Sequence, residues 1–274
     1  MKKKNRASSA ICLTLLFVFL FAPILVLIVF SFNAGKSTVN MSGFSFRWYK
    51  SLFTDGAALQ ALRNSVILAV TSAVISTVMG TAAAYGISKM RRKYLKAAVM
   101  TVTDIPMMNP DIITGISLML MFVFVGSLLR FTESLNFFTM LIAHITFSLP
   151  YVILSVLPKF NQMDKSMPEA ALDLGCTPLQ SLFRVELPEI MPGVVTGGLM
   201  AFTMSLDDFV ISYFTSSSKF VTLPVEIYTY TRKQIPPMFY SMFTLMFFLI
   251  LAVMIGMNVI QARDESRQKK RINV

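Results

Sequence analysis

Two adjacent carboxylates, Asp207 and Asp208, lie within an otherwise apolar run that extends from residue 190 to about 215. A carboxylate in apolar surroundings is costly, so it usually faces a cavity or a partner of opposite charge. There it can replace the water around a cationic group. Ser205, two residues before Asp207, is grouped with the pair. This chemistry binds and guides a cation without making or breaking bonds, so we expect no catalytic residue and no metal site.

The acid pair has two interpretations. If the helix is continuous, neighbouring residues point about 100° apart, so only one of the two acids can face a path unless the helix is broken. Alternatively, both acids cap a helix end at a membrane surface. The second interpretation has a cost, because acidic residues are unfavourable at the negative C-terminal end of a helix.

Three further side chains are of types that could contact a cation or carry a proton. Asp111 follows Asn109-Pro110, so it either lines a path or occupies the first turn of a helix that Asn109 caps. Trp48, the only Trp, could stack on an ammonium group or anchor the chain at a membrane interface. His144, the only His, could relay protons, but a hydrogen-bonded interior histidine is the more ordinary role.

Long apolar segments must position these residues. The chain has 274 residues, 55% hydrophobic and 14% charged, whereas soluble domains carry about a quarter charged residues. Six runs match the ~20 residues that a helix needs to cross ~30 Å of hydrocarbon, namely 11–32, 65–87, 112–129, 137–158, 190–206 (continuing to about 215) and 237–260. Since lipid-exposed backbone must satisfy its own polar groups, the sequence predicts an all-α membrane protein with six transmembrane helices.

Basic residues are distributed unevenly between these runs. The two ends of the chain and the segments after the second and fourth runs hold 17 of the 25 Lys and Arg residues. The positive-inside rule then places both termini in the cytoplasm, in a multi-pass protein of the cell (inner or plasma) membrane. This pattern accounts for the net charge of +11, so we expect the lipid bilayer as a partner and no nucleic acid.

Prolines and caps indicate where helices begin and end. Residues 97–128 are too long for one straight span, and Pro106 and Pro110 are expected to break them. Between the fourth and fifth runs, two helix starts are predicted from capping boxes, Ser166 with Glu169 and Thr177 with Gln180.

The segment from residue 163 to residue 192 therefore has its own architecture. The first of its helices is expected to stop at Gly175, and the second at Leu187-Pro188. A short helix, a glycine turn and another short helix projecting into the cytoplasm suit a docking element better than a simple connection.

This segment resembles the EAA loop of ABC importer permeases. The spacing of the family pattern is kept over 20 residues, with Val185 in place of the usual Ile. The resemblance implies a type I ABC importer permease (MetI-like) fold, coupled to a separate ATPase through Glu169, Ala170, Ala171, Gly175, Leu187 and Pro188. It also implies a second permease subunit, two copies of an ATP-binding subunit that hold ATP and Mg, and an extracytoplasmic substrate-binding protein. We expect no cofactor on this chain itself.

Other stretches are similar to the PotC-type permeases of spermidine/putrescine importers: 44–53, Asn109–Ile112, Ser148–Pro150, Leu206–Asp208 and Leu223-Pro224. This resemblance implies a polyamine pathway with Asp207, Asp208, Asp111, Trp48 and Ser205 as its residues. Same-family permeases for thiamine, iron, an opine or a phosphonate are alternatives. An ion-coupled secondary transporter is a further alternative, although the inverted repeats typical of that class are not visible, and so is a non-transporting membrane anchor.

The sequence suggests three parts. Residues 1–60 hold the first span and an outer loop, residues 61–262 form an ABC transmembrane type-1 domain that includes the EAA loop 163–192, and residues 263–274 are a basic cytoplasmic tail.

Overall fold

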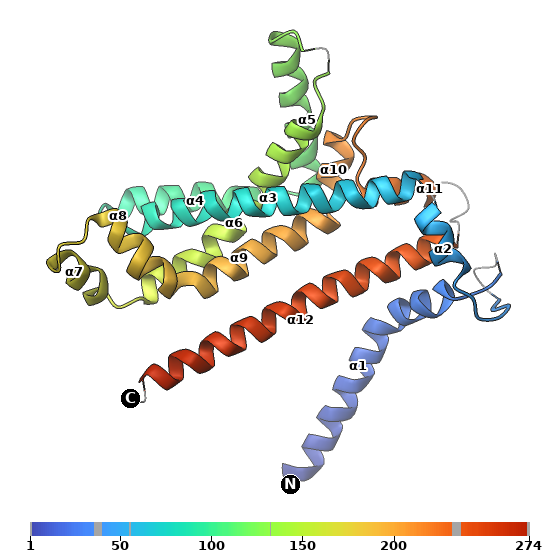
Figure 1. The fold of residues 1–274 in the computed structure, drawn as a ribbon, viewed down its shortest axis with the longest axis horizontal. Coiled ribbons are helices and arrows are strands. Elements are labelled where there is room, and N and C mark those ends of the chain that lie inside the picture. The colour runs from blue at the N-terminus through green and yellow to red at the C-terminus, as the bar shows by residue number, and fades with distance from the viewer. Residues whose placement is uncertain (1, 36–39, 55, 132, 232–236, 273–274) are drawn as a thin grey trace. The chain divides into compact units, whose positions relative to one another are not determined.

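The computed structural model describes residues 2–35, 40–54, 56–131, 133–231 and 237–272, and the regular elements within these ranges are helices. Six of the helical segments in this part of the chain are long and apolar enough to cross a membrane: Cys12–Ser31, Gly56–Ser88, Asp111–Leu128, Phe137–Gln162, Pro178–Asp207 and Met238–Gly256. The prediction of an all-α chain with six spans is therefore confirmed (Figure 1).

The chain forms two compact units. Unit 1 consists of residues 1–59 and 227–254, and unit 2 of residues 60–226 and 255–274. The sequence domains 1–60, 61–262 and 263–274 stay a prediction.

In unit 1, α1 (Lys2–Ser31) leads into a segment that folds back through α2 (Arg47–Thr54). The Tyr49 hydroxyl lies 2.8 Å from the Ser31 hydroxyl, and Phe32 stacks on Phe44 with ring centroids 5.2 Å apart. α12 (Met238–Ile272) contributes Met238, whose sulfur accepts a hydrogen bond from Ser51. This unit also holds the C-terminal part of α11 (Leu223–Thr231).

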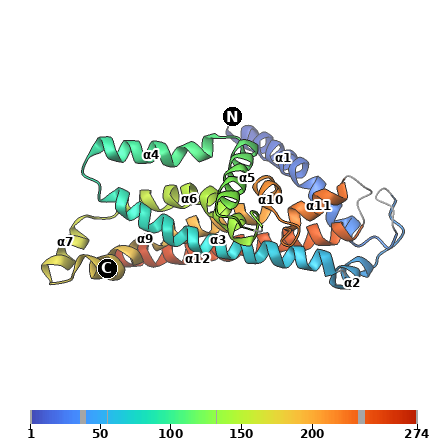
Figure 2. The same cartoon turned by 90° about the horizontal axis from the view of Figure 1, so that it is seen from above.

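Unit 2 is built around α6 (Phe137–Gln162) and α9 (Leu187–Asp207), which lie side by side, with α3 (Gly56–Ser88) packed against both (Figures 1 and 2). A buried apolar cluster joins the three helices, with Ala84 and Ile87 of α3, Val152 and Val156 of α6, and Ile190 and Ala201 of α9. Burial of these side chains holds α3, α6 and α9 together, and these helices carry buried polar residues.

Glycines permit this close approach. A Cβ at Gly197 of α9 would lie 3.1 Å from the Val152 Cα of α6, and a Cβ at Gly198 would lie 2.7 Å from Thr77 Oγ1 of α3. Small residues that let helix backbones approach are the usual packing device of membrane helices. The stripe of Gly193, Gly197, Gly198 and Ala201 is therefore part of the packing between helices.

The third span differs in detail from the prediction. α4 (Lys93–Met108) ends before Asn109-Pro110, and α5 (Asp111–Leu128) begins after them, so the predicted break at Pro110 is confirmed. Pro106 was expected to break the segment as well, but it lies inside α4. It falls in the last turn of that helix, so only the helix end has to adapt to the missing N–H.

The fifth apolar run, which continues to about residue 215, is not one continuous helix, so the broken-helix alternative holds. α9 ends at Asp207, and α10 (Val210–Thr215) begins after two non-helical residues. Hydropathy does not register this break, because the flanking residues are apolar on both sides of it.

The segment 163–192 contains α7 (Ser166–Asp173), α8 (Pro178–Ser181) and a five-residue π-helix, η1 (Leu182–Glu186). Gly175 has φ +87, its N–H donates to the Leu172 carbonyl, and the Cys176 N–H donates to the Ala171 carbonyl. This pair of bonds is the Schellman motif that ends helices, so the predicted stop at Gly175 is confirmed.

The caps of these short helices agree with the prediction in one case and not in the other. The reciprocal bonds of Thr177 and Gln180 are present, which confirms that capping box. The box of Ser166 with Glu169 is wrong, because Asp164 accepts the Ser166 N–H at 3.0 Å instead. That backbone bond lowers the pKa of the exposed Asp164 carboxyl, since it favours the ionised form.

Leu187-Pro188 does not end a helix, as had been expected. The Leu187 N–H donates to the Leu182 carbonyl across the wider π turn, and Pro188 lies in the first turn of α9. The π turn absorbs the N–H that proline lacks, so the helical path from Pro178 to Asp207 is continuous.

Candidate functional site

Asp208 lies at the break between α9 and α10. Its backbone leaves the helix with φ −64 and ψ 121. Its carboxylate accepts the N–H of Ile211 at 3.3 Å and the N–H of Ser212 at 2.7 Å. The side chain is only 7% exposed. Capping was one of the two interpretations of the acid pair, and it holds for Asp208, at the start of α10 rather than at the C-terminal end of a helix.

Asp207 is the last residue of α9, and its side chain is exposed. At this end the helix dipole is negative, so a carboxylate here gains nothing from the helix itself. Because the helix ends at Asp207, the 100° offset between neighbouring helical residues does not fix how the two acids point. The Asp208 carboxylate is bound by backbone N–H groups of α10, and the Asp207 side chain is exposed.

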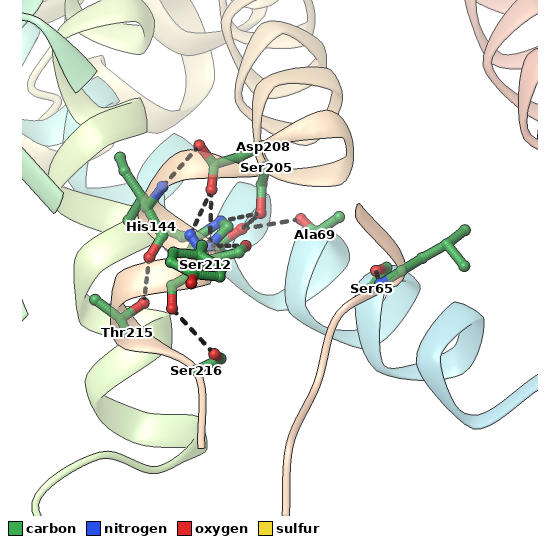
Figure 3. A network of polar contacts seen from close by, with 12 residues as sticks. Ser65, Ala69, His144, Ser205, Asp208, Ser212, Thr215 and Ser216 are labelled. Atoms are coloured by element: carbon green, nitrogen blue, oxygen red, sulfur yellow. Dashed lines mark hydrogen bonds and ion pairs between the residues drawn. The ribbon is translucent and has the colours of Figure 1, made fainter. Parts of the chain in front are cut away.

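His144 of α6 lies at the centre of a buried polar network around this break (Figure 3). Its Nδ1 is 2.8 Å from the Ser205 hydroxyl, and its Nε2 is 3.1 Å from the Ser212 hydroxyl and 3.8 Å from the nearer Asp208 oxygen. The Ser72 hydroxyl of α3 donates to Ser205 at 2.9 Å. The interpretation of His144 as a hydrogen-bonded interior histidine is therefore confirmed.

Ser205 is buried within this network. It had been expected on the substrate pathway, and the structure shows that its hydroxyl is engaged by His144 and Ser72. It belongs to the last turn of α9, which ends at Asp207, and its hydrogen bond to His144 holds this turn against α6. A direct role in the pathway stays a prediction.

Asp111 is the first residue of α5 and is exposed. It interacts electrostatically with Asp208. The two approach because α5 packs on α10 through Gly115, where an added Cβ would lie 3.5 Å from the Val210 carbonyl oxygen. Asn109 does not cap α5 as expected; it follows the last residue of α4. Asp111 thus begins the helix that packs on α10, the helix that follows Asp208.

Trp48 belongs to unit 1. It is 8% exposed, and its Nε1–H donates to the Asn33 carbonyl at 2.7 Å. The Arg47 guanidinium lies 5.4 Å from the centroid of its ring. Stacking on a substrate and anchoring at an interface both stay predictions.

Ser72 and Ser212 were not among the residues predicted from the sequence. A lone histidine in an apolar run signals that partners must exist, since a buried imidazole needs both nitrogens satisfied. The sequence offers many serines at comparable depth, so only the tertiary packing of α3, α6 and α10 identifies the two that are used.

The predicted coupling residues lie on α7, in the turn that follows it (Gly175) and at the start of α9. Glu169 and Ala170 are exposed in α7, Ala171 is buried beside them, and Leu187 and Pro188 begin α9. Exposed apolar side chains accompany them that the sequence had not singled out: Leu174 is 86% exposed, Leu179 68% and Phe183 63%. Large exposed apolar side chains are common at interaction surfaces, and the coupling role of this segment stays a prediction.

An ion pair ties this segment to α3. Lys89 Nζ lies 2.9 Å from one oxygen of Glu186 and 3.1 Å from the other. Glu186 belongs to η1 and is 2% exposed, whereas Lys89 directly follows α3. The end of one span is thereby held to the beginning of another.

The chain resembles known transport proteins over most of its length. Residues 76–267 match the family of binding-protein-dependent transport system inner membrane components. The putrescine transport system permease protein PotI of Escherichia coli (strain K12) is 36% identical over 235 residues, covering 86% of this chain and 84% of that protein. The spermidine/putrescine transport system permease protein PotC of Haemophilus influenzae is 35% identical over 248 residues, covering 90% and 94%.

Solved structures share the fold. A chain of the bacterial alginate ABC transporter, solved with an alginate pentasaccharide-bound periplasmic protein, superposes with a TM-score of 0.76, 16% identity and coverage of 96% of each chain. A chain of an amino acid ABC transporter superposes with a TM-score of 0.55 and 17% identity, covering 79% of this chain and 98% of that one. The predicted MetI-like permease fold is confirmed. The chain therefore belongs to the inner membrane components of binding-protein-dependent transport systems, the multi-pass permease subunits of ABC importers.

Proposed function

We propose that this chain forms half of the membrane pathway of an ATP-driven polyamine importer for putrescine or spermidine. The proposal rests on the sequence identity of 34–36% to polyamine permeases over most of the chain. The acid site supports it independently, because a polyamine is a chain of ammonium groups that needs carboxylates when it leaves water.

The acids have different roles in this proposal. Asp207, exposed at the end of α9, contacts an ammonium group directly. Asp208 is held by backbone N–H groups of α10 and contributes its charge from a fixed position. Asp111 adds a third negative charge close to Asp208. Fixed carboxylates replace part of the hydration of a passing cation without first having to reorganise.

The segment 163–192 couples the pathway to a separate ATPase. Its exposed apolar side chains Leu174, Leu179 and Phe183 insert into a groove of that subunit, with Glu169 and Ala170 beside them. The partners in this proposal are two ATP-binding subunits that hold ATP and Mg, a second permease subunit and an extracytoplasmic binding protein. The binding protein is included because the alginate transporter, which shares the fold, was solved in complex with a periplasmic protein. The orientation with both termini in the cytoplasm is part of the same proposal.

The test is uptake of radiolabelled putrescine and spermidine into vesicles that contain the complete complex. We expect uptake that requires ATP inside the vesicle and the binding protein outside. Thiamine, ferric iron, an opine and a phosphonate serve as alternative solutes. Uptake of one of these in place of a polyamine would refute the substrate assignment, and uptake that follows an ion gradient without ATP would refute the importer mechanism.

A matched pair of variants tests the site. Asp207→Asn removes the exposed acid at the break, and Glu133→Gln removes an exposed acid from a loop, where it pairs with Lys219. We expect Asp207→Asn to raise KM for spermidine about ten-fold, the cost of one charge-assisted hydrogen bond. Glu133→Gln is expected to transport as the wild type does. Equal kinetics of the two variants would contradict a direct role for Asp207.

A further inference from the structure

A chain of buried hydrogen bonds runs through three spans to the acid site. It begins at the Ala69 carbonyl and Ser72 hydroxyl of α3, 3.2 Å apart, and continues through Ser205 and His144 to Ser212. Ser72, His144 and Ser212 have no exposed surface, and Ser205 is 3% exposed. The Ser212 backbone N–H donates to the Asp208 carboxylate at 2.7 Å. Because water is excluded, each proton in this chain has to be placed between the members themselves.

The charge of Asp208 determines the direction of these bonds. An ionised carboxylate only accepts and favours a proton on the nitrogen that faces it, so His144 Nε2–H donates to the Ser212 hydroxyl oxygen. The unprotonated Nδ1 then accepts from Ser205, and Ser205 accepts from Ser72, which matches the donor role of Ser72. The Nε2–H also faces the nearer Asp208 oxygen at 3.8 Å, where a positive hydrogen is favoured.

A neutral side chain at position 208 removes that preference and allows the opposite direction. The Ser212 hydroxyl then donates to Nε2, and Nδ1–H donates to Ser205. Ser205 then donates to Ser72, and Ser72 donates to the Ala69 carbonyl, which lies in reach at 3.2 Å. Because the Ala69 carbonyl accepts at the α3 end, the reversed arrangement leaves none of these donors without a partner.

We infer that His144 is a positioning residue for the acid pair, and that the charged Asp208 holds it in the Nε2–H tautomer. Its two nitrogens bridge the break, since Ser205 precedes Asp208 on α9 and Ser212 follows it on α10. The imidazole thus fixes the angle at which α9 ends and Asp207 is presented. That this angle matters for a cation rests on the function proposed above; the tautomer does not.

The tautomer is measured by ¹⁵N NMR of the full chain in nanodiscs, purified through a tag that lacks histidine. His144 is the only histidine, so ¹⁵N-histidine labelling reports this ring alone. We expect Nε2–H in the wild type and in Asp207→Asn. Asp208→Asn removes the negative charge that favours a proton on Nε2, and we expect Nδ1–H in this variant. A wild-type ring with Nδ1–H or with two protons, or no change in Asp208→Asn, would overturn the inference.

Uptake by the complete complex tests the positioning role. The amide nitrogen of Gln can occupy the place of Nε2 and keep the bond to Ser212, whereas the shorter Asn reaches only the place of Nδ1. We expect His144→Gln to keep KM within about two-fold of the wild type and His144→Asn to raise it about ten-fold, as for loss of one buried bond. His144→Leu, which fills the volume without bonds, is expected to resemble His144→Asn.

A merely structural role predicts a different order, in which Leu and Gln behave alike and uptake falls only with the yield of assembled complex. That result would refute the positioning role. If the wild-type complex takes up no polyamine, the proposed function fails, and the NMR result still decides whether the hydrogen-bond chain exists.

Discussion

Breaking the ion pair between Lys89 and Glu186 should destabilise the protein, and the two halves of the pair should matter unequally. The Glu186 side chain is 3% exposed, whereas that of Lys89 is 47% exposed. Lys89→Met leaves a buried carboxylate without its counter-charge. Glu186→Gln leaves an ammonium group that can turn to water, next to an amide that still accepts a hydrogen bond. We therefore expect the lysine substitution to be the more damaging one.

The magnitude follows from the geometry. Removing one partner of a fully buried pair costs roughly 3–5 kcal/mol. Half of the lysine is in contact with solvent, so screening reduces the cost to about 2 kcal/mol for Lys89→Met. For Glu186→Gln we expect about 1 kcal/mol, the value of one ordinary hydrogen bond. For a chain of this size, 2 kcal/mol corresponds to a shift in Tm of roughly 4–8 °C.

The assay is thermal unfolding of the purified complex for the wild type, both single variants and the double variant Lys89→Met/Glu186→Gln. Because the double variant has no orphaned charge, it should be about as stable as Glu186→Gln alone. The coupling energy between the two substitutions is then near 2 kcal/mol. The reasoning is refuted if Lys89→Met is no less stable than Glu186→Gln, or if the effects of the two substitutions simply add.

Three other expectations concern packing and backbone. Gly197→Ala should cost about 1–3 kcal/mol, because its Cβ would meet the Val152 backbone at 3.1 Å; Gly256→Ala, with nothing within 4 Å, is the control, and equal Tm values would contradict the packing. Gly175→Ala should cost about 1–2 kcal/mol from its positive φ alone, since no atom lies within 4 Å, and an unchanged Tm would argue against that turn. Trp48→Phe should cost about 1 kcal/mol for the lost indole bond, seen as earlier denaturation by guanidinium; a more stable variant would contradict it.

The spans and the turn at Gly175 were predictable because the sequence patterns that specify them are local. Charge-free runs of about 20 residues have few alternatives to a membrane helix. At Gly175 and Thr177 the side-chain type itself dictates the backbone or the cap. Where two neighbouring residues can serve the same purpose, local rules fail. Asp164 and Ser166 are both good caps, and the chain uses Asp164.

The site was predictable in residue type but not in arrangement. Acidic residues in an apolar run identify Asp207 and Asp208, yet hydropathy cannot show that the helix breaks after Asp207. The break is stabilised by His144, which is 64 positions away from Asp208 in the sequence and meets it only after α6 and α9 pack. Such contacts depend on tertiary structure, and no periodicity in the sequence encodes them.

The unbroken helical path from Pro178 to Asp207 has a mechanical consequence. Its 30 residues form a rod of about 45 Å, with the exposed knob of Leu179 and Phe183 at one end and Asp207 at the other. If such a rod pivots by 10° about one end, the other end swings by about 8 Å. A small displacement at Leu179 and Phe183 is thus amplified into a much larger displacement of the Asp207 carboxylate.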